Sequence, residues 1–115
     1  MSEQETKPVI GFGDFGLNEK TLAALKKVNY ENPSPIQAAF IPIAVTGQDC
    51  MGQAQTGTGK TAAFILPALQ FIDDRIPATQ VLVLTPTREL SDQVNEEARR
   101  LSEGTNCRPT RCVGG

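Results

Sequence analysis

The chain has 115 residues, which is enough for one domain with a modest hydrophobic core. Its formal net charge is −2, so no general basic surface attracts nucleic acid, and any such contact needs a few well-placed groups. Three cysteines without CxxC spacing and the absence of histidine argue against a zinc site and predict reduced thiols.

The N-terminal residues are polar and lack the apolar segment of a signal peptide. No apolar run approaches the length that spans a membrane. We therefore expect a cytoplasmic protein without membrane contacts, or a nuclear one if the source is eukaryotic. Residues 1–12 are expected to form a disordered tail.

Two helix starts follow this tail. Asn18 is predicted to be the N-cap of a helix over Glu19–Val28, in which apolar residues recur on one face. Ser34 and Pro35 have the pattern of an N-cap followed by proline at the first helical position. The second helix is expected over Ile36–Ile41 and to break or kink at Pro42.

Strands and helices are predicted to alternate in the rest of the chain. A short continuous apolar run such as Val81–Leu84 is typical of a strand buried on both faces. In chain order we expect a strand over 49–53, a helix over 60–72 bent at Pro67, a strand over 81–84, a helix over 88–101 and a strand starting at 110–113. This order predicts an α/β fold with a parallel sheet.

The segment between the first strand and its helix is Ala54-Gln55-Thr56-Gly57-Thr58-Gly59-Lys60-Thr61, a pattern typical of loops that hold nucleoside triphosphates. Its glycines permit a tight turn that points backbone N–H groups at phosphate oxygens. Lys60 supplies a positive charge for the β- and γ-phosphates, and the Thr61 hydroxyl can ligate Mg²⁺. We predict these two residues as catalytic. The alternative is a surface turn that happens to precede a lysine.

Three further segments extend the pattern. Upstream lie Phe15 and Tyr30-Glu31-Asn32-Pro33-Ser34-Pro35-Ile36-Gln37; downstream lie Pro86-Thr87-Arg88-Glu89-Leu90 and Gly114-Gly115. Together with the loop, this ordered set resembles the DEAD-box RNA helicases, with their Q motif, motif I (AxTGxGKT), motif Ia (PTREL) and GG motif. Ala54, where a generic phosphate loop has glycine, matches that family's motif I.

The resemblance implies a P-loop NTPase fold: a RecA-like parallel sheet flanked by helices, here truncated. Residues 13–115 would form the N-terminal part of the first RecA-like helicase domain. The implied cofactors are ATP or ADP with Mg²⁺, the metal being held with the nucleotide at Thr61. Residues 49–53 would lack neighbouring strands, so they would pair with another copy, a partner or the remainder of the helicase core.

The nucleotide site implied by the resemblance depends on Gln37. A glutamine amide can accept from adenine N6 while donating to N7, whereas guanine presents two acceptors. The resemblance also implies that Tyr30 stacks on adenine and that Asn32 adds a contact; alternatively, Gln37 is one exposed residue at a well-capped helix start. The predicted nucleotide contacts are Phe15, Tyr30, Asn32, Gln37, Ala54, Gln55, Thr56, Gly57, Thr58, Gly59, Lys60, Thr61 and Ala62.

RNA contacts are implied after the second strand. A helix N-terminus carrying Thr87 and Arg88 suits a phosphate, and the resemblance implies that this phosphate belongs to an RNA backbone bound without regard to sequence. The predicted RNA contacts are Pro86, Thr87, Arg88, Gly114 and Gly115. Alternatively, Arg88 forms an ion pair with Glu89 or Asp92.

Two charged segments have simpler interpretations. Phe71-Ile72-Asp73-Asp74 resembles a metal-binding strand end, but it follows Lys60 too closely for a crossover connection, so we expect a solvated helix end. Glu96-Glu97 and Arg99-Arg100 are expected to form local ion pairs on an exposed helix face.

The 115 residues contain no Asp-Glu-Ala-Asp segment, no SAT motif and no second domain with arginine fingers. The family is that of ATP-dependent RNA helicases, but phosphoryl transfer depends on those groups. The isolated chain is therefore expected to bind adenine nucleotide without efficient hydrolysis. Two alternatives remain: a non-catalytic nucleotide-binding or interaction module, and an unrelated P-loop ATPase or nucleotide kinase.

Overall fold

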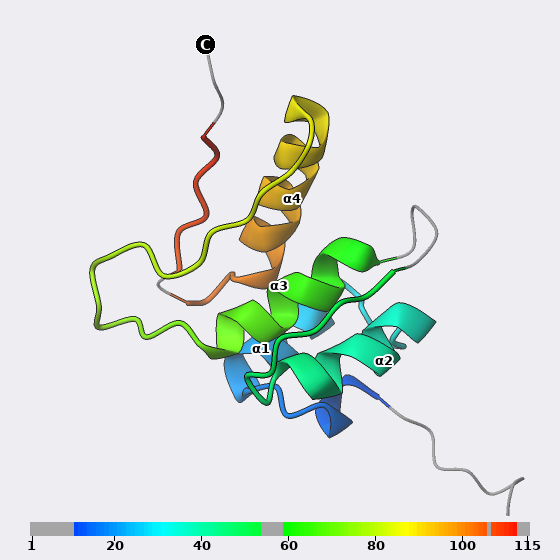
Figure 1. Cartoon of the computed structure of the whole chain (residues 1–115). Helices are drawn as coiled ribbons and strands as arrows, with labels where there is room; N and C mark the ends of the chain where they lie inside the picture. The colour runs from blue at the N-terminus through cyan, green and yellow to red at the C-terminus, as the bar shows by residue number, and fades with distance from the viewer. Residues whose placement is uncertain (1–10, 54–58, 106, 113–115) are drawn as a thin grey trace, which may run out of the picture.

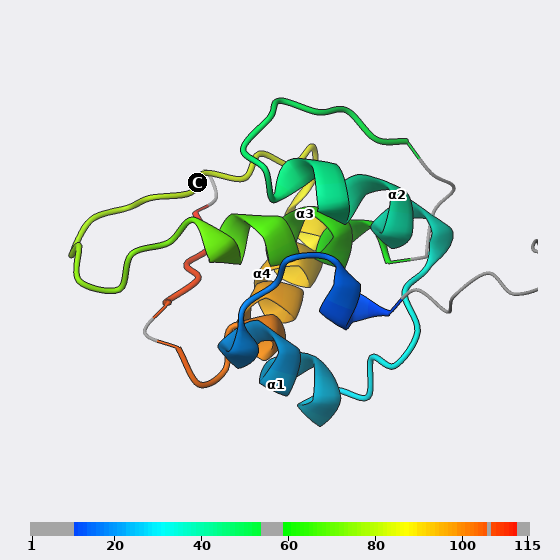
Figure 2. The same ribbon diagram turned by 90° about the horizontal axis from the view of Figure 1, so that it is seen from below.

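The computed structural model describes residues 11–53, 59–105 and 107–112. The elements in these ranges are the 3₁₀ helix η2 (Phe12–Asp14) and the helices α1 (Glu19–Lys27), α2 (Pro35–Ala44), α3 (Lys60–Gln70) and α4 (Arg88–Leu101). Helix α3 lies in the middle and contacts α2 and α4, while α1 packs against α4 (Figure 1, Figure 2).

Side-chain caps set the starts of α1 and α4. The Oδ1 atom of Asn18 accepts from the backbone N–H of Thr21 at 2.9 Å, as expected for an N-cap. Thr87 does the same for α4, because its Oγ1 accepts from the N–H of Leu90 at 3.1 Å. Both predicted helices are confirmed, although α1 ends at Lys27, one residue before the predicted end.

The second helix does not break at Pro42, because α2 continues to Ala44. The other predicted outcome, a kink at Pro42, stays a prediction. Proline removes one backbone donor, but Pro42 lies in the last turn, where only two residues follow it in the helix. Ile41, immediately before it, is completely buried. Tertiary packing of this face therefore outweighs the lost hydrogen bond.

Helix α3 also passes through a proline, Pro67, and ends at Gln70, two residues before the predicted end. The Gln70 side chain then ties α3 to the start of α1. Its Oε1 accepts from the N–H of Asn18 at 2.7 Å, and its Nε2 donates to Oγ1 of Thr21 at 2.9 Å. These bonds satisfy polar groups at a helix start that would otherwise need water.

The hydrophobic core forms where the helices meet η2 and the segment that follows it. Leu25, Ile41, Leu66 and Leu101, one from each of the four helices, are among the most completely buried side chains. The core cluster comprises Phe12, Phe15, Leu17, Leu25, Ile41, Ala62, Ile65, Leu66, Val94 and Leu101. The helices are therefore stabilised chiefly by burial of apolar surface between them.

The end of α1 positions the loop that follows it. Asn29 has φ +62°, in the left-handed region, and its N–H donates to the carbonyl of Lys26 at 3.1 Å. The N–H of Tyr30 donates to the carbonyl of Leu25 at 2.9 Å. This pair of bonds is a Schellman motif, which turns the chain sharply and brings Tyr30 back beside the helix.

We predict that Asn29→Val destabilises the protein by about 1–2 kcal/mol, because a β-branched side chain is strained at this φ. Asn29→Gly should be as stable as the unmodified chain or slightly more stable, since glycine adopts the left-handed region freely. Urea denaturation followed by circular dichroism measures both. Equal stability of the two variants would show that this turn carries no backbone constraint.

The predicted parallel sheet is not present within the described residues: segments 49–53, 81–84 and 110–112 form no strands there. Extended backbone becomes a strand only when a neighbour accepts and donates its hydrogen bonds. Apolar side chains of these segments are uncovered as well, with Met51 96%, Leu82 80% and Leu84 85% exposed. The strand predictions are therefore corrected to segments without regular secondary structure, and residue 113 lies outside the described residues.

The predicted disordered tail also needs a correction at its C-terminal end. Phe12 belongs to η2, is only 6% exposed and contacts the Phe15 ring edge-to-face, with centroids 5.8 Å apart. Residues 1–10 lie outside the described residues, so the rest of that prediction stays untested. None of the described helices has the length and apolar character needed to cross a membrane.

Candidate nucleotide pocket

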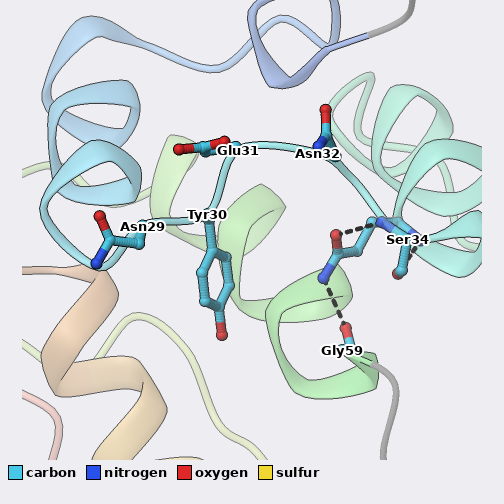
Figure 3. A pocket seen from close by; sticks show the side chains of 7 residues that line it. Asn29, Tyr30, Glu31, Asn32, Ser34 and Gly59 are labelled. Carbon is cyan, nitrogen blue, oxygen red and sulfur yellow. Dashed lines mark hydrogen bonds between the residues drawn. The ribbon is translucent and has the colours of Figure 1, made fainter.

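A pocket of about 480 Å³ lies between the loop after α1, the start of α2 and the start of α3 (Figure 3). Most of its lining comes from the loop, which is short and polar. The lining residues are Asn29, Tyr30, Glu31, Asn32, Ser34, Gln37 and Gly59. Four of these, Tyr30, Asn32, Gln37 and Gly59, are among the nucleotide contacts predicted from the sequence.

Gln37 connects the two sides of this pocket. Its Oε1 accepts from the N–H of Ser34 at 2.8 Å, and its Nε2 donates to the carbonyl oxygen of Gly59 at 3.2 Å (Figure 3). The Oγ of Ser34 accepts from the N–H of Gln37 in return, at 3.4 Å, which completes a capping box. Gln37 is 4% exposed, so the interpretation of an exposed glutamine at the helix start is wrong.

These bonds use only part of the hydrogen-bonding capacity of the Gln37 amide. A primary amide offers two N–H donors and an oxygen with two lone pairs. The protein uses one donor for Gly59 and one lone pair for Ser34. One N–H and one lone pair remain, which is the donor-and-acceptor pair that adenine requires.

Gly59, the residue before α3, lines the pocket, so the N-terminus of α3 lies beside it. Its φ of +80° lies in the left-handed region, and it is the N-cap of α3. Lys60 and Thr61 follow in the first turn, where backbone N–H groups and the helix dipole favour an anion. Lys60 is exposed and Thr61 is half-buried. Residues 54–58, the rest of the predicted phosphate loop, lie outside the described residues.

Other predicted nucleotide contacts have different environments. Asn32 is exposed and lines the pocket, on the opposite side of the loop from the Tyr30 ring (Figure 3). Phe15 and Ala62 are instead buried in the core, at 3% and 0% exposure, and neither lines the pocket. Tyr30, Asn32 and Gln37 thus all line the pocket, but the Asn32 side chain points away from the other two, and Phe15 does not line it.

The Tyr30 side chain makes two contacts that the sequence did not suggest. Its ring is inclined by 29° to the ring of Phe12, with centroids 6.4 Å apart. Its hydroxyl donates to Oε2 of Glu97 in α4. Burial, followed by this hydrogen bond and the negative charge of Glu97, raises the pKa of Tyr30 to about 12, although the Arg100 charge acts against the increase.

The predicted RNA contacts Pro86, Thr87 and Arg88 are exposed at the start of α4. Asp92, one suggested partner for Arg88, forms a 2.8 Å ion pair with Arg111 of the C-terminal segment. Gly114 and Gly115 lie outside the described residues.

The two charged segments differ from one another. Asp73 pairs with Arg75 at 3.0 Å, and that hydrogen-bonded partner lowers the pKa of Asp73. No cluster of metal ligands occurs in the ranges that the structure describes. Glu97 forms the predicted local ion pair, with Arg100 at 3.0 Å, but it is not on an exposed face, because its side chain is only 15% exposed.

Two functional candidates were missed from the sequence. Ser34 lines the pocket as well as capping α2, and the Ser-x-x-Gln spacing of a capping box was a sufficient signal for its bond with Gln37. Glu97 lies 67 residues from Tyr30 in the chain. No local pattern reports such a contact, since it depends on how α4 packs.

The family model described as DEAD/DEAH box helicase matches residues 34–115, which is most of the chain. The chain therefore belongs to the DEAD/DEAH box helicase family.

Among individual relatives, the ATP-dependent RNA helicase DeaD of Escherichia coli (strain K12) is 54% identical over 96 residues, which cover 84% of this chain and 15% of that protein. The ATP-dependent RNA helicase CshA of Listeria monocytogenes is 45% identical over 104 residues, covering 90% and 20%. The chain thus spans no more than about one fifth of the length of these relatives.

Solved structures show the same relationship. The RNA helicase Prp28 of Chaetomium thermophilum bound to ADP matches with a TM-score of 0.74 and 40% identity, over 84% of this chain and 24% of that one. A DEAD box protein of Methanococcus jannaschii matches with a TM-score of 0.77 and 32% identity, over 83% and 26%. The described helices therefore have the arrangement found in part of a DEAD-box RecA-like domain.

Proposed function

We propose that this chain is the ATP-binding portion of an RNA helicase, in which ATP hydrolysis is coupled to RNA binding and local duplex unwinding. The observation that carries the proposal is the hydrogen bond from Gln37 Nε2 to the Gly59 carbonyl. It places an amide suited to adenine beside the N-terminus of α3, which is suited to phosphate. The relative from C. thermophilum bound to ADP supports the same ligand class.

In this proposal each part of the site has one role. Adenine occupies the pocket against Tyr30, Asn32 and Gln37, and the phosphates lie at the start of α3 with Lys60 as their cation. Thr61 would hold Mg²⁺ with the nucleotide, and that ion would neutralise phosphate charge. Phe15 would act only indirectly, by supporting the core beneath the loop.

RNA is proposed to bind through its backbone at Pro86, Thr87 and Arg88. The helix dipole at the N-terminus of α4 favours an anion such as phosphate there. The Saccharomyces cerevisiae relative Dbp5, solved with RNA and ADP BeF3, has a TM-score of 0.74 to this chain at 30% identity, which supports this ligand class.

Residues 13–115 are proposed to form the N-terminal part of the first RecA-like domain. Segments 49–53 and 81–84 would then become parallel strands once further strands cover them. We propose that these uncovered segments contact the remaining helicase core or a second copy of the chain.

Calorimetric titration with Mg²⁺ and ATP, ADP or GTP tests the proposed ligand. We expect ATP and ADP to bind more tightly than GTP, by a factor corresponding to about 1–3 kcal/mol. Gln37→Ala should abolish this preference, and Lys60→Ala should weaken all three nucleotides, because their phosphates lose a cation. Turnover of ATP with and without RNA should remain negligible for the isolated chain.

Two exposed residues provide matched controls. Gln93→Ala removes an amide from the surface of α4, and Lys26→Ala removes a cation from α1. Neither change should alter nucleotide affinity. A folded chain that binds ATP and GTP equally, or binds neither, would contradict the proposed adenine site. Robust RNA-stimulated hydrolysis of ATP would contradict the expected inactivity of the isolated chain.

A further inference from the structure

Tyr30 is the single tyrosine of the chain, which contains no tryptophan, and it lies at the wall of the pocket. Its ring contacts the ring of Phe12, to which it is inclined by 29°. The backbone places Tyr30 directly after the left-handed residue Asn29, so its direction depends on a sharp turn. Holding the ring in one position costs conformational entropy, which a further contact from outside the loop can offset.

Helix α4 provides that contact through a carboxylate with two partners. One oxygen of Glu97 accepts from the Tyr30 hydroxyl, and the other accepts from Nη1 of Arg100 at 3.0 Å. The Glu97 side chain is 15% exposed, whereas that of Arg100 is 45% exposed. Arg100 thus balances the charge of a largely buried carboxylate. The pair therefore differs from an ordinary surface ion pair, in which water solvates both charges.

The neighbouring charges on α4 do not share this environment. Glu96 and Arg99 carry the same charges one position earlier in the helix. Glu96 is exposed, whereas the Glu97 side chain is 15% exposed; Arg99 and Arg100 are both exposed. Within the described part of the chain, Glu97 accepts a hydrogen bond from Tyr30 of the loop after α1, and the charge of Arg100 acts on the same hydroxyl. The contact is therefore specific to one helix face, and the exposed neighbours serve as matched controls.

We propose that Glu97 and Arg100 are positioning residues for the nucleotide pocket: they hold Tyr30 by its hydroxyl so that its ring forms a fixed wall. The inference rests on the proposed function of the pocket as an adenine site. A wall that is already ordered spares the ligand the cost of immobilising a side chain, and this raises affinity. Neither residue lines the pocket, so both act through Tyr30.

The experiment compares four forms of the chain: the unmodified chain, Tyr30→Phe, Glu97→Ala and the double variant. Calorimetric titration with Mg²⁺ and ADP should show roughly three- to tenfold weaker binding for each single variant, the range expected when a ligand must order one side chain. The double variant should bind no more weakly than the weaker single variant, because both changes break one link. Glu96→Ala should bind as the unmodified chain does.

Ionisation of Tyr30 gives a second, independent measurement. Because the chain has one tyrosine, its near-ultraviolet absorbance titrates this hydroxyl alone. The stabilisation from the neutral hydroxyl is complete below pH 10.0 and is lost as the pH rises through about 12. Glu97→Ala should lower the pKa of Tyr30, since it removes a hydrogen bond and a negative charge, and Glu96→Ala should leave it unchanged.

These measurements separate two kinds of failure. If the unmodified folded chain does not bind ADP, the proposed function fails and the positioning role fails with it. If it binds ADP and Glu97→Ala lowers the pKa of Tyr30 without weakening ADP, the contact exists but does not position the pocket, and the inference is overturned. A Tyr30→Phe variant with unchanged ADP affinity overturns it as well.

Discussion

Gly59→Ala is expected to destabilise the protein by roughly 2–4 kcal/mol, from left-handed strain and a disrupted buried hydrogen bond. The φ of Gly59 is +80°, which costs energy for any residue with a Cβ. A Cβ there would also overlap Nε2 of Gln37 and lie 3.3 Å from Oγ of Ser34. Gln37 would have to move, so adenine-nucleotide affinity should fall at least tenfold.

Gly47→Ala is the matched control for this prediction. Gly47 has a similar φ of +89°, but nothing lies within 4 Å of the position its Cβ would take. Its replacement should therefore cost only the backbone strain, about 1–2 kcal/mol, and leave nucleotide binding intact. Urea denaturation and calorimetry measure the two effects. Equal behaviour of the two variants would mean that the contact between Gly59 and Gln37 contributes little.

Leu66→Ala is expected to destabilise the protein by about 3–5 kcal/mol, the range for deleting a fully buried leucine. Leu66 is completely buried in α3, the helix that contacts both α2 and α4. Such a loss is comparable with the entire stability of a small domain, so the variant should be largely unfolded at room temperature. Circular dichroism should show loss of helical signal, and nucleotide binding should disappear with it.

Leu82→Ala makes the same chemical change on the surface. Leu82 is 80% exposed, so its truncation should change stability by less than about 0.5 kcal/mol. A large destabilisation by Leu82→Ala would instead show that the 81–84 segment is covered in solution, by a second copy or another part of the chain. A small effect of Leu66→Ala would contradict the core described here.

Local signals in the sequence predicted the helices well. The α4 boundaries, Arg88–Leu101, match the prediction because Thr87 caps the helix through a bond within three residues. The strand predictions failed for the opposite reason. Val81–Leu84 has strand-like composition, but its hydrogen-bond partners must come from another segment, and the described residues contain none.

The same division applies to the candidate site. The phosphate-loop pattern ending at Lys60 and Thr61 predicted a nucleotide site from the sequence, because that signal is contiguous in the chain, and the resemblance to a known family added Gln37 and the adenine base. Only the tertiary structure decided that Gln37 bonds to Gly59, that Phe15 is buried away from the pocket, and that Glu97 holds Tyr30. Those contacts join residues from different elements, so they exist only once α2, α3 and α4 have packed together.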